Sequence, residues 1–445
     1  MEKYKSHLLA LVRGKTDQVT TADIYSEQNA ILLTAGTLVT QEVYDHITGF
    51  DLRAPLDSSL TLVGMLSASD IDKKINQLVK QDNFIKPIDD ALGNSGILQH
   101  CCTCLYRYQY LEEIVTVLEI EHPQLFQQSL LSAYMAYICA IANECSQQDI
   151  EHAFMAGLFH DIGLLFIKRA TRHKKGALTS KEWQEMQLHP IIAYKLFKTI
   201  DDFPMIVARA ILQLHEKADG SGYPMSTEGD KLNDLGELIS LLDDVIAIYY
   251  KQFKPAQRSL SDLTPILQMN SNGYKQQTLS CVIQVIKRSP PSSIGSAEYN
   301  IILDLIDYTY RQQLYVNTLA DTIKQTNEAI GFEHHIKPLN LLQDATMNIL
   351  VVISSSGLQD ILKDVWLEQV SESNQEDLYK EVEHTRLMLE EIIYQLRHYQ
   401  KRANTFVSKN TDDMATHVVN ALAIFEQTAL PQASNKLESY WQKYL

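Results

Sequence analysis

Cysteine is scarce in this sequence, with six residues among 445. Six cysteines in a chain of this length are too few for a disulfide scaffold. Three of them, Cys101, Cys102 and Cys104, lie close together, but no second pair follows at the spacing of a zinc ribbon. We therefore predict ordinary reduced thiols, as in a cytoplasmic protein.

Basic residues are also in short supply: 39 Lys and Arg face 55 Asp and Glu, which gives a formal net charge of −16. Binding to a nucleic-acid polymer needs clustered cations, so this balance argues against such a partner and against anionic membrane surfaces. No stretch approaches the roughly 18–20 apolar residues that cross a bilayer. The apolar run Leu8–Val12 is too short for a secretory signal. These absences predict a cytoplasmic protein without a membrane span.

The length predicts two or three domains, and the hydrophobic fraction of 45% is that of a folded protein. Residues 1–93 mix short apolar runs with turn signals: Asn29–Gly36 has the pattern of a strand and turn, and Thr40–Ile47 that of a helix whose first residue is the N-cap. We expect a small α+β module here, followed by a linker at Gly93–Gly96. From 97 to 290, apolar residues recur at helical spacing, which predicts a helical domain.

Residues 296–445 form a third predicted segment, also helical, after a boundary rich in Pro and Ser at 288–295. Its longest apolar pattern advances in alternating steps of four and three residues, as a heptad seam does. The seam consists of Leu378, Val382, Thr385, Leu389, Ile392, Leu396, Tyr399, Ala403 and Phe406. Two interpretations stay open: a coiled coil that joins a homodimer, or a helix packed in a bundle of the same chain. Both imply contact with other helices or protein partners rather than chemistry.

The residues able to do chemistry gather between 154 and 244. In chain order they are His160-Asp161, His189-Pro190, His215-Glu216, the run Asp219-Gly-Ser-Gly-Tyr-Pro224, and Asp243-Asp244. Imidazoles and carboxylates are ligands of divalent iron, manganese and zinc. An adjacent His-Asp pair suits a carboxylate that bridges two ions while the imidazole holds one. Each piece alone is weak, because a lone histidine is more often a core residue and the glycine run an ordinary turn.

Taken together, these motifs resemble the HD-GYP family, bacterial members of the HD phosphohydrolases that act on cyclic di-GMP. The resemblance covers roughly residues 125–248 and rests on His160-Asp-Ile-Gly163, His189-Pro190, His215-Glu216 and Asp219-Gly-Ser-Gly-Tyr-Pro224. It implies a mainly α fold: an HD-type helical bundle at 97–290, between the small α+β module and the helical C-terminal region.

The resemblance also implies roles for individual residues. The metal ligands would be His160, Asp161, His189, His215 and Asp243, with Asp161 bridging two ions and central to catalysis. They would hold one or two divalent ions, with iron or manganese expected. The residues that would border a bound dinucleotide are Asp219, Gly220, Gly222, Tyr223, Pro224 and the basic Lys174.

Three positions depart from the family's pattern. Gln128 stands where the family has its first ligand histidine, and Leu214 replaces the first His of the family's His-His-Glu. Each change takes a ligand from one ion, since a glutamine carbonyl is a poor substitute for imidazole and leucine has no donor atom. Leu164 replaces a lysine that would balance phosphate charge. His122 and His152 would complete the ligand set only if the fold brings them close.

Two hypotheses follow. The first is a metal-dependent phosphodiesterase that hydrolyses cyclic di-GMP or a related phosphoester with a degraded metal site. The second is a catalytically inactive relative that binds cyclic di-GMP or serves as a scaffold for protein partners. The five retained ligands favour the first hypothesis, and the three departures favour the second. Measurements of metal content and turnover separate the two.

Overall fold

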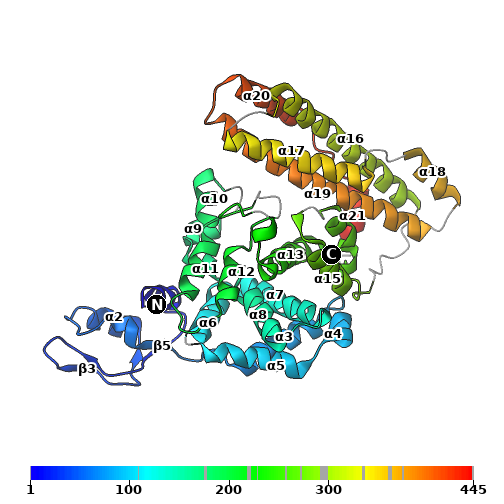
Figure 1. Cartoon of the computed structure of the whole chain (residues 1–445). Helices are drawn as coiled ribbons and strands as arrows, with labels where there is room; N and C mark the ends of the chain where they lie inside the picture. The colour runs from blue at the N-terminus through cyan, green and yellow to red at the C-terminus, as the bar shows by residue number, and fades with distance from the viewer. Residues whose placement is uncertain are drawn as a thin grey trace. The chain divides into compact units, whose positions relative to one another are not determined.

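The chain is mainly α-helical with a small α+β module near its N-terminus, which confirms the predicted fold class (Figure 1). It separates into two compact units, Met1–Glu216 with Gly222–Ile246 and Lys217–Ser221 with Ala247–Leu445. The three-part division expected from the sequence, at 1–93, 97–290 and 296–445, stays a prediction. The computed structural model describes residues 2–108, 110–174, 178–217, 222–227, 229–255, 258–270, 273–290, 299–332, 336–358, 363–372 and 375–442.

The small module contains two short antiparallel sheets. In the first, β1 (Gln18–Thr20) lies between β4 (Leu38–Val39) and β5 (Leu60–Leu62), and in the second β2 (Ile24–Tyr25) pairs with β3 (Ile31–Leu33). The turn after β3 passes through Gly36, whose φ of +80° is the left-handed conformation that favours glycine. The Thr40 hydroxyl accepts the Val43 N–H and so begins α2 (Gln41–Ile47) where the sequence predicts it.

Two helices form the centre of the first unit, α7 (Pro123–Ala142) and α8 (Gln147–Phe159), which lie side by side (Figure 1). They approach closely because Gly157 has no side chain: a Cβ there would stand 2.6 Å from the carbonyl oxygen of Ser132. The helices that pack on this pair or on its neighbours are α1 (Glu2–Val12), α3 (Ala68–Lys80), α4 (Lys86–Leu92), α5 (Ser95–Cys104) and α6 (Leu111–Glu121).

Helix α7 corrects one expectation, that no segment is long and apolar enough to cross a membrane. Its 20 residues include an 18-residue window with a mean hydropathy of 1.3, which passes that test, and it is the one helix to do so in the described part of the chain. However, 78% of this window is buried inside the protein. A core helix of a globular unit is apolar on all sides because other helices surround it. This position explains the apolar composition of α7.

After α8 the chain forms the elements that carry the remaining chemistry. They are η3 (Ile162–Phe166), α9 (Arg169–Arg172), α10 (Ser180–Met186), α11 (His189–Phe197), α12 (Met205–Leu212) and α13 (Asp234–Ile248). η3 packs against the start of α11 at Gly163, where a Cβ would stand 2.0 Å from the carbonyl oxygen of His189. Only glycine at position 163 therefore lets the first residue of α11 lie this close to the end of α8.

The second unit contains a bundle of long helices. α16 (Tyr299–Ile330), α17 (Lys337–Ser356) and α19 (Gln375–Val407) pack on one another, and α20 (Asp413–Gln427) packs on α16 and α19 (Figure 1). The shorter helices of this unit are α14 (Thr264–Met269), α15 (Gln276–Ile286), α18 (Lys363–Glu372) and α21 (Asn435–Gln442). Apart from Thr385, the heptad seam of α19 is buried in the apolar cores of this unit. The seam is thus covered within the same chain.

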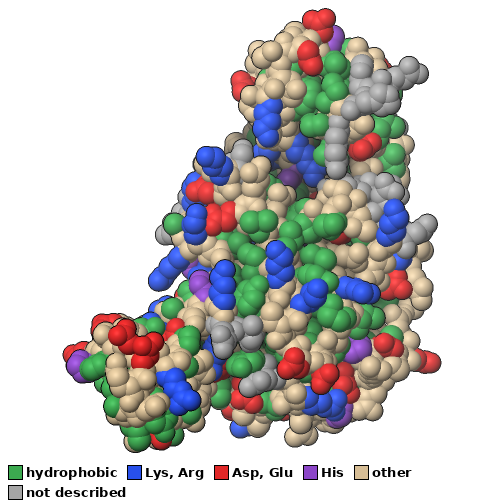
Figure 2. Space-filling model, turned by 60° about the vertical axis from the view of Figure 1, so that its left-hand side comes forward, with side chains coloured by type: hydrophobic (Ala, Val, Ile, Leu, Met, Phe, Trp, Pro, Cys, Tyr) green, Lys and Arg blue, Asp and Glu red, His purple; other side chains and the backbone are tan. Residues whose placement is uncertain are grey.

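Most charged side chains lie at the surface, and acidic and basic ones are interspersed over the face shown in Figure 2. One group in the second unit is mostly buried instead, and we call Arg258, Glu383, Arg386 and Glu390 the arginine cluster. Arg386 donates to both carboxylate oxygens of Glu383, at 2.7 and 2.8 Å, and Arg258 donates to the same carboxylate at 2.5 Å. Charge-assisted pairs of this kind satisfy both partners inside the protein.

Candidate metal centre

Four segments of the first unit bring together all five residues that the sequence singles out as metal ligands. His160 directly follows α8 as its C-cap residue, and Asp161 lies between it and η3. His189 begins α11, His215 follows α12, and Asp243 lies on α13. We call these five the histidine–aspartate cluster. Their roles as ligands stay a prediction, although their convergence is a property of the fold.

The cluster consists of two groups that share one carboxylate. In the first, His160 Nε2 lies 3.4 Å from Asp161 Oδ2 and 3.6 Å from Asp243 Oδ1. In the second, Asp161 Oδ1 lies 3.3 Å from His189 Nε2, which lies 3.2 Å from His215 Nε2. Within each group the ligand atoms all stand within 4.8 Å of one another. One oxygen of Asp161 thus serves each group, which is the arrangement of a carboxylate that bridges two ions.

Backbone carbonyls determine which imidazole nitrogens face the cluster. His160 Nδ1 lies 2.8 Å from the Gly157 carbonyl oxygen, and His189 Nδ1 lies 2.8 Å from that of Met186. Because a carbonyl oxygen can only accept, each Nδ1 must carry the hydrogen. In a neutral ring Nε2 then presents a lone pair to the Asp161 carboxylate. Two acceptors face each other at both contacts, so a proton or a cation must lie between them. This donor set fits a divalent metal.

The charges within the cluster shift the pKa values of its members. Burial by itself lowers the pKa of His160, but the carboxylates of Asp161 and Asp243 outweigh burial and hold this pKa well above its usual value. Burial raises the pKa of Asp161, but the imidazoles of His160 and His189 outweigh it and hold this pKa well below the usual range. Without a metal, a proton on His160 therefore supplies the positive charge that the carboxylates need.

Of the three departures from the family pattern, Leu164 and Leu214 lie within three residues of a cluster member in the chain, while Gln128 lies 32 residues before His160. Gln128 is half-buried on α7, and Leu214, directly before His215, is fully buried. Leu164 lies in η3 and its carbonyl oxygen accepts a hydrogen bond of 2.9 Å from the Arg172 guanidinium. A buried cation therefore lies at the backbone of the position where the family's lysine is missing. The sequence alone does not identify Arg172 as this cation. The hydrogen bond joins the Arg172 side chain to the Leu164 backbone eight residues away, and residue spacing does not predict such a contact.

The loop after His215 lies over the second group. The Tyr223 N–H donates to the His215 carbonyl oxygen at 3.0 Å, and the two rings stack with centroids 4.7 Å apart. Trp183 of α10 lies beside Tyr223, at 6.4 Å between ring centroids. Gly222 and Pro224 flank the tyrosine in this loop, whereas Asp219 and Gly220 lie outside the described residues.

Glu216 holds this loop in place, a role that the sequence reasoning missed. Its buried carboxylate accepts the backbone N–H of Met225 at 2.6 Å and that of Thr227 at 2.8 Å. The sequence did contain a signal for this role. Glu216 directly follows the candidate ligand His215 and precedes a glycine-rich loop, so its carboxylate is well placed to accept backbone N–H groups of that loop. Lys174, predicted to contact substrate, instead pairs with Glu182 at 2.6 Å. Whether Lys174 also contacts substrate stays a prediction.

The two additional histidines lie elsewhere. Neither His122 nor His152 belongs to a group of metal-ligating atoms in the described part of the chain. The His122 ring stacks on His173 with centroids 4.5 Å apart. Burial, then the neighbouring charges of Arg172 and His173, lower the pKa of His122 to about 4. His122 is thus a neutral imidazole beside cations, the reverse of the environment of His160.

Comparison with known proteins relates part of this chain to HD-domain phosphodiesterases. Residues 113–275 match the family model described as HD domain. A 3′3′-cGAMP-specific phosphodiesterase of Vibrio cholerae is 27% identical over 206 residues, which is 44% of this chain and 40% of that protein. The cyclic di-GMP phosphodiesterase PdeB of Borreliella burgdorferi is 26% identical over 151 residues, 34% of this chain and 40% of the relative. A second cGAMP-specific phosphodiesterase of V. cholerae is 35% identical over 89 residues, 20% of this chain and 17% of the relative.

The helical fold and the His160-Asp161 pair at the end of α8 define this part of the chain as an HD domain. Within that class, the cyclic-dinucleotide phosphodiesterases among its relatives and the Gly222-Tyr223-Pro224 loop support an HD-GYP-type member. The chain spans 40% of the length of each of the two relatives first named, so the shared region is the domain and not the whole protein.

Proposed function

We propose that this chain is a metal-dependent phosphodiesterase that hydrolyses a cyclic dinucleotide, with cyclic di-GMP as the first candidate substrate and 3′3′-cGAMP as the second. The relatives are named for hydrolysis of these two compounds. The observation that carries the proposal is the Asp161 carboxylate shared by two groups of potential ligands. The expected cytoplasmic location belongs to the same proposal.

The residues present fit a pair of ions. His160, Asp161 and Asp243 would hold one ion, while Asp161, His189 and His215 would hold the other. Bound iron or manganese would supply Lewis acidity toward a phosphate oxygen and toward water. The chain's own contribution is to keep the two carboxylates and three imidazoles in position. The hydrogen bonds from both Nδ1 atoms to backbone carbonyls do this by preventing the rings from turning.

The aromatic side chains beside the cluster support a nucleotide substrate. Tyr223 and Trp183 lie together next to His215, and Trp183 is 44% exposed. Flat aromatic faces are platforms for nucleobases, so a base held here would place its phosphodiester near the cluster. Hydrolysis then forms one bond from a water oxygen to phosphorus and breaks the bond from phosphorus to the 3′-oxygen of the sugar.

The second candidate function is a catalytically inactive protein that binds the dinucleotide and contacts protein partners through its C-terminal helices. The observation in its favour is Leu214, whose fully buried apolar side chain leaves the second group without the family's additional imidazole. Under this alternative the protein would bind cyclic di-GMP without cleaving it.

The test compares metal content and turnover in the natural protein and two matched variants. The protein is purified without chelator and under reducing conditions, and its metals are measured by elemental analysis. Hydrolysis of cyclic di-GMP and of 3′3′-cGAMP is then followed with added manganese or iron. We expect Asp161→Ala to reduce both metal content and turnover by at least about 100-fold, since it removes a ligand from both groups. Asp244→Ala, which changes an exposed residue beside Asp243, should leave both unchanged.

Two results contradict the proposal. One is a natural protein that binds metal and dinucleotide in calorimetry but turns over neither substrate, which establishes the second candidate. The other is an Asp161→Ala variant that keeps its full metal content, because the shared carboxylate would then not be a ligand.

A further inference from the structure

A second cluster of potential metal ligands lies in the first unit and shares no residue with the histidine–aspartate cluster. His100 and Cys104 stand one helical turn apart on α5, and Glu151 lies on α8, which packs against α5. One atom from each of these three side chains lies within 4.8 Å of the other two. The Cys104 side chain is buried, while His100 and Glu151 are partly accessible.

Three side chains converge on a single nitrogen of His100. Its Nε2 atom lies 2.8 Å from Glu151 Oε1, 3.3 Å from Cys104 Sγ and 2.8 Å from the side-chain amide of Gln147. One imidazole nitrogen carries either one hydrogen or one lone pair, so it serves only one of these three contacts at a time. A cation at the centre would satisfy all of them together.

The two helices supply matched pairs of ligands. Gln147 and Glu151 are four residues apart on α8, as His100 and Cys104 are on α5, so each pair projects from one face of its helix. The Gln147 amide nitrogen now faces His100. A 180° rotation about the last side-chain torsion of Gln147 puts the carbonyl oxygen in its place. Four donors of three kinds, nitrogen, sulfur and two oxygens, then surround one point.

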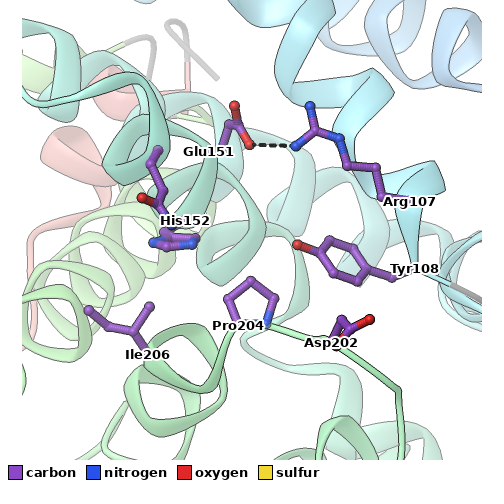
Figure 3. A pocket seen from close by; sticks show the side chains of 8 residues that line it. Arg107, Tyr108, Glu151, His152, Asp202, Pro204 and Ile206 are labelled. Carbon is purple, nitrogen blue, oxygen red and sulfur yellow. Dashed lines mark hydrogen bonds and ion pairs between the residues drawn. The ribbon is translucent and has the colours of Figure 1, made fainter.

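The surroundings of Glu151 support the same function. Arg107 donates to Glu151 Oε2 at 3.3 Å (Figure 3). The other oxygen, Oε1, lies 2.8 Å from His100 Nε2. Glu151 also lines an open cavity of about 570 Å³, into which the ring of Tyr108 points from the side opposite His152 (Figure 3). An orienting partner for a carboxylate ligand is a feature of metal sites.

We propose that His100, Cys104 and Glu151, with the carbonyl oxygen of Gln147, bind a thiophilic divalent cation of the zinc class. Cysteine sulfur, histidine nitrogen and carboxylate oxygen are the ligands of four-coordinate zinc, with bonds of about 2.0–2.3 Å. Donors at those bond lengths stand about 3.3–3.8 Å apart, so the present separations need only small side-chain movements. On binding, the Cys104 thiol becomes a thiolate and its proton leaves to solvent. The histidine–aspartate cluster, with nitrogen and oxygen donors only, lacks this preference for soft metals.

Cobalt(II) is the probe that distinguishes the two clusters. The full-length protein is stripped of metal, kept reduced and titrated with Co²⁺ while its absorption spectrum is recorded. A cobalt–thiolate bond gives a near-ultraviolet charge-transfer band, which a site of nitrogen and oxygen donors does not give. We expect the band in the natural protein and in Asp161→Ala. Cys104→Ser should lose the band and should bind one equivalent of Co²⁺ less than the natural protein. Glu151→Gln should weaken Co²⁺ binding by about 10- to 100-fold.

The control is Cys145→Ser, which removes the nearby exposed thiol and should leave the band unchanged. Circular dichroism shows whether each variant is folded, and Glu151→Gln retains the thiol if Cys104→Ser does not fold. Absence of the band in the natural protein overturns the proposal, since Cys104, His100 and Glu151 then form only a hydrogen-bonded contact. A band that survives in Cys104→Ser or disappears in Cys145→Ser or Asp161→Ala also overturns it.

Discussion

The histidine–aspartate cluster and the arginine cluster both place charged groups inside the protein, yet they are built in opposite ways. In the arginine cluster, both oxygens of Glu383 face guanidinium N–H donors, which are charged at every physiological pH. Burial raises the pKa of Glu383, but Arg386 and Arg258 outweigh it and lower this pKa. In the histidine–aspartate cluster, two carboxylates face imidazole nitrogens that have no permanent positive charge.

The difference shows how a structural ion pair can be told from a site that binds something. Both oxygens of Glu383 are paired with buried guanidinium groups, so this carboxylate already has its counter-charge and a further cation there would meet repulsion. A carboxylate faced by the Nε2 atoms of His160 and His189 obtains a counter-charge only from a proton or a metal. We therefore expect substitutions in the arginine cluster to change stability and those in the histidine–aspartate cluster to change metal binding.

The largest expected effect of this kind is the loss of stability in Glu383→Gln. Removing the charge takes away the one buried carboxylate that Arg258 and Arg386 share, which costs about 3–5 kcal/mol. Urea unfolding of the second unit, followed by circular dichroism, measures this loss, and metal content should not change. Glu426→Gln, at an exposed position on α20, is the control and should stay within about 0.5 kcal/mol. A loss below about 1 kcal/mol for Glu383→Gln would show that the arginine cluster is not structural.

Gly163→Ala tests the histidine–aspartate cluster without changing any of its five side chains. The added Cβ would stand 2.0 Å from the carbonyl oxygen of His189, so α11 must move away from Asp161. We expect metal affinity to fall by about 10- to 100-fold, measured by titration with manganese. The control is Gly96→Ala on α5, where a Cβ meets only Asn94 Oδ1 at 3.5 Å. Unchanged affinity in Gly163→Ala would show that the position of His189 does not limit binding.

Leu214→His asks whether the degraded side of the histidine–aspartate cluster can be repaired. Leu214 is fully buried, so an imidazole there costs about 1–3 kcal/mol unless it finds a partner. A metal bound by the second group would be that partner, and Gln128→His would add a further ligand to the first group. We therefore expect a lowered melting temperature without metal, recovery on adding manganese, and higher turnover. Equal destabilisation with and without metal would mean that position 214 does not face the ion.

The smallest expected effect concerns His122, a half-buried imidazole beside the Arg172 guanidinium. Its pKa of about 4 in the folded protein is below the value of about 6.5 in an unfolded chain. Between these values the unfolded state binds a proton that the folded state does not, so stability falls as pH drops from 6.5 to 4. His122→Gln should remove about 1 kcal/mol of that loss, since solvent screens this half-buried ring. Urea unfolding at several pH values measures the difference. A loss of metal in this variant would instead identify His122 as a ligand.

Local features were predictable from the sequence because they depend on residues close together in the chain. Thr40 caps a helix through a contact three residues away, and the adjacency of His160 and Asp161 needs no fold to be seen. Long-range contacts were not predictable in the same way. Glu216 anchoring the next loop and Arg172 donating to Leu164 depend on how the backbone turns, which residue spacing does not specify.

The sequence by itself determined that the heptad seam of α19 must be buried, because an apolar stripe of that length is unfavourable in water. Only the tertiary structure decided that other helices of the same chain cover it. Likewise, the spacings of His100 from Cys104 and of Gln147 from Glu151 place each pair on one helical face. The sequence does not show that these faces meet, because contact between residues more than 40 positions apart depends on how α5 packs against α8.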